Sequence, residues 1–92
     1  MILTYEGNEM TVHLLPGCIT VELKSDTLYE KSLLVSYQAI YIIEYDEIRA
    51  VRIKNHSIII CLNDGSEISL EVNDYMGLYQ KLIEVLTSMG RY

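Results

Sequence analysis

The stretch Ile40–Val72, IYIIEYDEIRAVRIKNHSIIICLNDGSEISLEV, decides the fold of this 92-residue chain. Its last part, from Glu67 to Val72, alternates polar and apolar side chains, which is typical of a half-buried β-strand. Asn55-His56 and Asp64-Gly65 interrupt the apolar runs, and both pairs favour tight hairpin turns because Asn and Gly accept positive φ angles. The stretch predicts three or four consecutive antiparallel strands, placed at Ile40–Glu44, Ile48–Lys54, Ser57–Leu62 and Glu67–Val72.

The residues before this stretch predict a first hairpin. Glu9–Leu15 and Cys18–Lys24 each alternate polar and apolar side chains. Pro16-Gly17 lies between them and marks a turn, because Pro has no N–H for a ladder and Gly tolerates positive φ. A further strand is expected over Lys31–Ser36, where Leu33-Leu34-Val35 resumes the apolar character.

After Val72 the apolar period changes from two to the spacing of three and four that an amphipathic helix shows. Asn73 or Asp74 is the expected N-cap, and an acidic side chain there also suits the helix dipole. Gly90 fits the position just beyond the carboxyl end. The pattern predicts one helix over about Asp74–Met89, with an apolar stripe made of Tyr75, Leu78, Tyr79, Leu82, Ile83, Leu86 and Met89.

These segments predict one domain, residues 1–92, of mainly β class. Six or seven antiparallel strands are expected before a single C-terminal helix. Two arrangements fit this order. The strands form a small barrel or a pair of orthogonal sheets that the helix closes at one end, or they stay an open sheet with the helix along one face.

The order of elements resembles the pleckstrin-homology (PH)-like superfold, and in particular its small bacterial PH and GRAM-like domains. The resemblance lies in Tyr45-Asp46-Glu47-Ile48, the strands after it, Asp64-Gly65 and the final helix, whereas the first forty residues match only by strand count. It implies a small barrel closed by the helix. The chain departs from phosphoinositide-binding members because Pro16-Gly17, in the first hairpin loop, brings no base and the helix has no Trp. The resemblance therefore supports the scaffold and argues against that site.

Charge and hydropathy argue against several classes of partner. Thirteen acidic and seven basic residues give a net charge of −6. Nucleic acids are bound by basic patches that release counterions, so a nucleic-acid partner is not expected. No apolar run approaches the ~20 residues of a membrane helix, and no secretory signal is visible. We expect a cytoplasmic protein that is not an integral membrane protein.

No motif for catalysis, a metal or a cofactor is recognisable. His13 is predicted on the outward side of a strand and His56 in a turn, each without a Cys or carboxylate at ligand spacing. Cys18 and Cys61 lie far apart and predict two buried free thiols, with a disulfide as the alternative. We expect no enzyme activity, no metal and no cofactor; the alternative is a site that the fold assembles from distant residues.

One basic cluster offers an alternative function. Arg49, Arg52 and Lys54 follow one another along a predicted strand, with Arg52 and Lys54 on the same face. They suit an anionic ligand or a lipid headgroup, which would make peripheral membrane contact possible. The competing interpretation is cross-strand pairing with acidic residues such as Glu67.

Tyrosines give the main functional hypothesis. The chain has eight Tyr and no Phe or Trp, and Tyr is enriched at protein interfaces. We predict a non-enzymatic interaction module that binds protein and self-associates as a homo-oligomer. Its predicted partner-binding residues are Tyr37, Tyr41, Ile43 and Tyr45. The alternative for the apolar face of Tyr41, Ile43 and Tyr45 is that the helix covers it.

Overall fold

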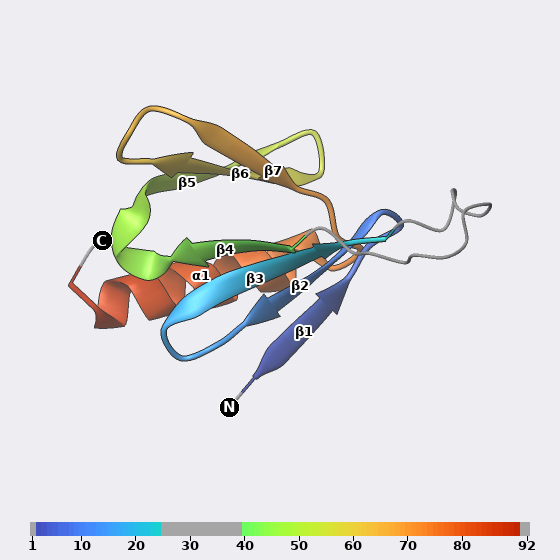
Figure 1. The fold of residues 1–92 in the computed structure, drawn as a ribbon, viewed down its shortest axis with the longest axis horizontal. Coiled ribbons are helices and arrows are strands. Elements are labelled where there is room, and N and C mark those ends of the chain that lie inside the picture. Colours follow the sequence, from blue (N-terminus) through green and yellow to red (C-terminus); the bar gives the residue numbers. More distant parts are fainter. Residues whose placement is uncertain (1, 25–39, 91–92) are drawn as a thin grey trace.

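A computed structural model describes residues 2–24 and 40–90. In this part of the chain, seven antiparallel strands form two sheets and one α-helix follows them (Figure 1). The larger sheet has the order β1-β2-β3-β4 and the smaller has the order β5-β6-β7. The elements are β1 Leu3–Glu6, β2 Met10–Leu14, β3 Cys18–Leu23, β4 Ile40–Glu44, β5 Ile48–Lys54, β6 Ser57–Leu62, β7 Glu67–Leu70 and α1 Tyr75–Ser88.

The two sheets do not close into a barrel. In residues 2–24 and 40–90, every strand pairs only with strands of its own sheet, and no pair of hydrogen-bonded strands links the two sheets. A short 3₁₀ turn, Tyr45–Glu47, carries β4 into β5. A second link joins the segment after β7 to the end of β1: the backbone N–H of Asn73 donates to the carbonyl of Glu6 at 2.8 Å. Of the predicted arrangements, the small barrel is therefore wrong, whereas the mainly β class, with antiparallel strands followed by one C-terminal helix, is confirmed.

The hairpins form where turn residues predict them. Asn55 and His56 have φ angles of 52° and 67°, as a two-residue hairpin with two positive φ angles requires. The second hairpin turns through Asn63–Ser66, and Gly65 supplies a φ of 95°. There the Asp64 carboxylate accepts hydrogen bonds from the Ser66 N–H (2.9 Å) and hydroxyl (2.6 Å), and these bonds lower the pKa of Asp64.

Predicted strand positions agree closely with the structure. The predicted hairpin of Glu9–Leu15 and Cys18–Lys24 is β2 and β3, and the short apolar start of the chain adds β1 to it. β7 ends at Leu70, two residues earlier than predicted, although Val72 remains buried. The strand predicted over Lys31–Ser36 lies outside the described residues.

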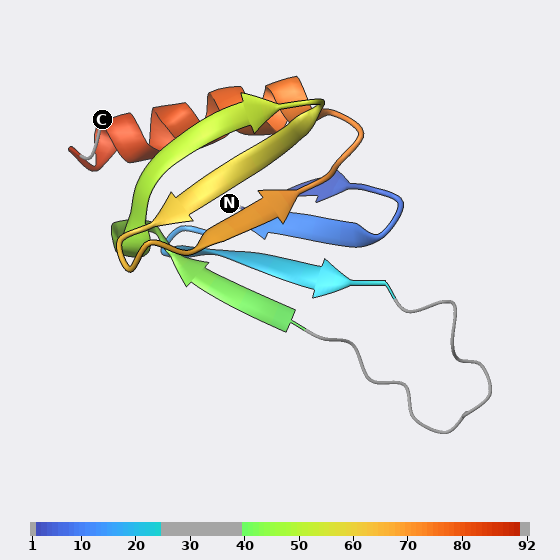
Figure 2. The same ribbon diagram turned by 90° about the horizontal axis from the view of Figure 1, so that it is seen from above.

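The helix completes the core: it lies behind β3 and β4 in Figure 1 and runs along the upper side, beside β5, in Figure 2. Asp74 is its N-cap: the Asp74 carboxylate accepts the N–H of Gly77 at 3.0 Å. Gly90 follows the helix with a φ of 79°. The predicted helix is thus confirmed to within one residue at each end. One helical stripe packs toward β5 and β6, and its fully buried members are Leu78, Leu82 and Leu86.

Candidate functional site

β4 lies at the edge of the four-stranded sheet. It pairs with β3 on one side, and among the described residues no strand pairs with its other side. In this pairing Tyr41 stands opposite Val21, and Ile42 stands opposite Thr20. Figure 2 shows β4 as the outermost strand of the four-stranded sheet. Within residues 2–24 and 40–90, the backbone N–H and C=O groups on that side of β4 have no partner strand, so they present an edge to which another strand can pair.

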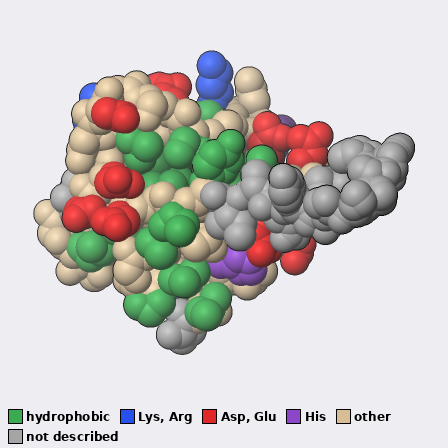
Figure 3. Space-filling model, in the orientation of Figure 1, with side chains coloured by type: hydrophobic (Ala, Val, Ile, Leu, Met, Phe, Trp, Pro, Cys, Tyr) green, Lys and Arg blue, Asp and Glu red, His purple; other side chains and the backbone are tan. Residues whose placement is uncertain are grey.

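Two large hydrophobic side chains flank this free edge. Tyr41 is 52% exposed and Ile42 is 64% exposed. Tyr41 belongs to the inner face, with the buried Val21, whereas Ile42 belongs to the outer face, with Thr20. Figure 3 shows hydrophobic side chains gathered across the middle of this side of the molecule, between the two sheets. We call Tyr41, Ile42 and the free backbone of β4 the β4 edge.

Two residues of the predicted partner-binding set are not at the surface. Ile43 is 2% exposed and Tyr45 is 1% exposed, because both lie in the core that α1 completes. The prediction that Tyr41, Ile43 and Tyr45 share one accessible surface is corrected accordingly: of the three, only Tyr41 is accessible. Tyr37 lies outside the described residues. Ile42, which the sequence pattern did not single out, is the most exposed large hydrophobic residue of the described strands.

Tyr45 is a buried structural residue and not a surface contact. Its hydroxyl donates to the backbone carbonyl of Leu15 at 2.8 Å, so the polar end of this buried ring is satisfied. Burial raises the pKa of Tyr45 to about 12, with a smaller contribution from nearby Cys18. This side chain anchors the end of β4 to the turn between β2 and β3.

The basic cluster is open to solvent but is partly neutralised. Arg52 forms an ion pair with Glu67 at 3.0 Å, as the cross-strand interpretation predicts. Arg49 lies at a bulge in the β5–β6 ladder, and Lys54 ends β5. The five steps between them correspond to roughly 16 Å of strand. An anion at Arg52 would have to compete with the Glu67 carboxylate, so the three side chains do not form one compact anion site.

A row of polar side chains crosses the outer face of β1, β2 and β3. The Thr4 hydroxyl lies 3.1 Å from His13 Nδ1, and His13 Nε2 lies 3.4 Å from Glu22 Oε1. The carboxylate beside His13 was missed by sequence reasoning, because it comes from the cross-strand register. The order hydroxyl, imidazole, carboxylate occurs in nucleophilic hydrolases. Here these side chains lie on the outer face of the sheet, and their contacts join β1, β2 and β3 across the sheet.

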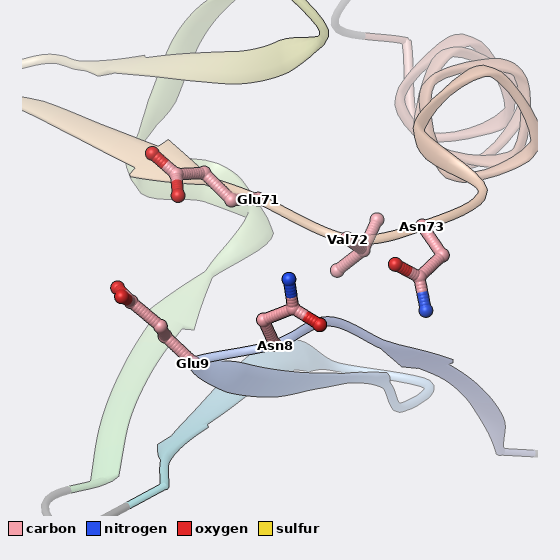
Figure 4. Close-up of a pocket in the computed structure, with 5 residues that line it drawn as sticks. All are labelled: Asn8, Glu9, Glu71, Val72 and Asn73. Carbon is pink, nitrogen blue, oxygen red and sulfur yellow. The ribbon is translucent and has the colours of Figure 1, made fainter.

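A pocket of about 210 Å³ lies between the β1–β2 turn and the segment that joins β7 to α1 (Figure 4). Figure 4 shows the carboxylates of Glu9 and Glu71 toward one side and the amides of Asn8 and Asn73 nearer to Val72. All four polar side chains are exposed. A smaller pocket, about 150 Å³, is lined by Glu47, Leu62, Asn63 and Asp64. Both are open surface hollows at turns.

The remaining candidate residues are the two cysteines and His56. Cys18 and Cys61 are free thiols, but only Cys61 is buried, so the prediction of two buried thiols holds for one of them. His56, in its turn, packs edge-on against the ring of Tyr75 with centroids 5.2 Å apart. In residues 2–24 and 40–90, no three His, Cys, Asp or Glu side chains gather closely enough to hold a metal ion.

Two further comparisons concern membrane-spanning helices and known proteins. The described part of the chain contains no helix with the length and apolar character of a membrane span. The chain matches no protein-family model, and searches of curated proteins and of solved structures returned no match.

Proposed function

We propose that this chain is a non-enzymatic interaction module on a PH-like scaffold, which binds protein, including further copies of itself, through the β4 edge. The order of elements, a four-stranded and a three-stranded sheet followed by one helix, supports the scaffold. One observation carries the function: β4 combines an unpaired backbone edge, among the described residues, with the exposed side chains of Tyr41 and Ile42. The proposed setting is the cytoplasm.

The positions of these two side chains favour an added strand over a flat docking surface. Successive side chains of a strand point to opposite faces of the sheet, so no flat partner covers both Tyr41 and Ile42. A strand that pairs with the edge of β4 places its own side chains beside both of them. Backbone hydrogen bonds then give affinity, and the flanking side chains give specificity.

Exposed hydrophobic side chains distinguish β4 from the other edge strands. Charged side chains on edge strands discourage pairing with other chains, but β1, β4 and β7 each carry one charge at a strand end, and only β5 carries three. Among the described edge strands, β4 exposes two large hydrophobic side chains, Tyr41 and Ile42, whereas β5 exposes Ile53 and neither β1 nor β7 exposes one. The side chains of β4 therefore favour pairing more than those of the other described edges.

The alternative, an anionic ligand or lipid headgroup at Arg49, Arg52 and Lys54, has weaker support. Arg52 is already paired with Glu67, and the chain as a whole is acidic. Co-sedimentation with liposomes tests this alternative. Binding that increases with the fraction of anionic lipid and is lost in Arg49→Gln/Lys54→Gln would favour it over a protein partner.

The experiment for the proposed function measures molar mass by light scattering for the wild type and for Tyr41→Asp. We expect a mass above that of the 10.6 kDa chain for the wild type and a return to the monomer mass for the variant. Ile2→Asp is the matched control, because it removes a similarly exposed hydrophobic side chain (60%) beside the opposite edge strand. A folded Tyr41→Asp protein with unchanged mass and unchanged partner binding contradicts the proposal.

A further inference from the structure

The β4 edge has a sequence that is complementary to itself. We infer that the partner is a second copy of this chain, and that the two β4 strands pair antiparallel about a twofold axis at Ile42. This inference rests on the proposed function and specifies its geometry. It would extend the four-stranded sheet of one copy into that of the other, so that one sheet runs through the dimer.

The register follows from the five residues of β4. An antiparallel pair centred on Ile42 sets Ile42 against Ile42 of the other copy and Tyr41 against Ile43. Both pairings join β-branched or aromatic residues, which are favourable cross-strand combinations. The half-exposed Tyr41 ring then lies along the inner face beside the other copy's core, and the two Ile42 side chains cover each other on the outer face.

Charges do not oppose this register. Glu44 of one copy falls opposite Ile40 of the other, so no two carboxylates face each other directly. The next acidic side chain in that row is Glu22, which is opposite Ile40 on β3. Two strand spacings, about 9.6 Å, then separate Glu22 from Glu44 of the other copy. That is close to the screening length at physiological salt, so their repulsion is weak.

One further argument favours a second copy over an unrelated protein: a twofold interface needs one patch that is complementary to itself, and twofold dimers are the commonest oligomers. The net charge of each chain gives a way to distinguish the two partners. Each chain carries a net charge of −6, so two copies repel at long range, and salt weakens that repulsion. Self-association should therefore strengthen as salt is raised, whereas binding of a basic partner would weaken.

Cysteine cross-linking tests the geometry. In a Cys18→Ser background, which removes the partly exposed native thiol, we compare Ile42→Cys with Thr20→Cys. In the inferred dimer the two Cα atoms at position 42 lie about 4.5–5.5 Å apart, within disulfide range. Those at position 20, on the same face but one strand inward, lie three strand spacings or about 14 Å apart.

Mild oxidation with copper phenanthroline should convert most of the Ile42→Cys protein into a covalent dimer and leave Thr20→Cys and the background variant without a covalent cross-link. Cross-linking of Ile42→Cys no higher than that of Thr20→Cys overturns the inference. If Tyr41→Asp still lowers the mass while Ile42→Cys does not cross-link, the β4 edge binds in another geometry and only this inference fails. If neither variant responds, the proposed function fails as well.

Discussion

The hydroxyl of Tyr45 donates a hydrogen bond to the backbone carbonyl of Leu15 across 2.8 Å. This contact fixes the end of β4 against the turn between β2 and β3, although thirty residues separate the two partners. It thereby helps to hold the β4 edge at the side of the sheet. Tyr45→Phe keeps the buried ring but leaves the carbonyl without this donor. We expect a loss of about 1 kcal/mol in the free energy of unfolding, measured by urea denaturation.

The same residue gives a pH prediction. Burial raises the pKa of Tyr45 from 10.0 to about 12, so the unfolded chain releases this proton at lower pH than the folded chain. The folded state therefore gains stability from the protonated Tyr45 hydroxyl below pH 10. As the pH rises from 10 to 12 the free energy of unfolding falls, by up to about 2–3 kcal/mol. Far-ultraviolet circular dichroism in urea at each pH measures it. Tyr45→Phe should lose less stability over this interval than the wild type; equal slopes would contradict the prediction.

Gly7 is where two backbone segments come together. A Cβ at this position would collide with the carbonyl oxygen of Glu71, in the segment between β7 and α1. Gly7→Ala should therefore lower the free energy of unfolding by about 1–3 kcal/mol. Gly17→Ala is the control, because a Cβ there meets no atom within 4 Å. Equal stabilities of the two variants in urea would show that this corner is not closely packed.

The helix N-cap can be tested with neighbouring residues. Asp74→Ala removes the carboxylate that accepts the Gly77 N–H and should cost about 1 kcal/mol in thermal or urea unfolding. Asn73→Ala removes an exposed side chain while keeping the backbone N–H that bonds to Glu6, so its effect should stay within about 0.5 kcal/mol. A reversed order of the two effects would place the cap at Asn73.

Local signals predicted much of this fold. Asn55-His56 and Asp64-Gly65 each contain the residue types that their turns need, and the helix follows from apolar spacing and an acidic N-cap. These features depend on neighbours in sequence. Alternation also assigned Tyr41 and Ile43 correctly to the same face of the sheet.

The candidate site was less predictable, because it depends on the place of β4 in the sheet. Alternation assigns Tyr41 and Ile43 to one face but does not show which of them lies over the core and which near its rim. Their exposures differ widely, 52% against 2%. Ile42 was not in the predicted set because that set follows the face of Tyr41, Ile43 and Tyr45, and Ile42 lies on the other face. The Glu22 carboxylate beside His13 likewise depends on the register of β2 against β3.

Hydrogen exchange along β4 tests the central claim most directly. The amide protons of Ile40–Glu44 that point to the free edge should gain protection as protein concentration rises, because a second strand then binds them. Those of Leu3–Glu6, on the opposite edge of the same sheet, serve as the internal reference and should show no such change. Protection in β4 that rises with concentration and is absent in Tyr41→Asp supports the account. Exchange rates in β4 that are independent of concentration, whether fast or slow, would contradict it.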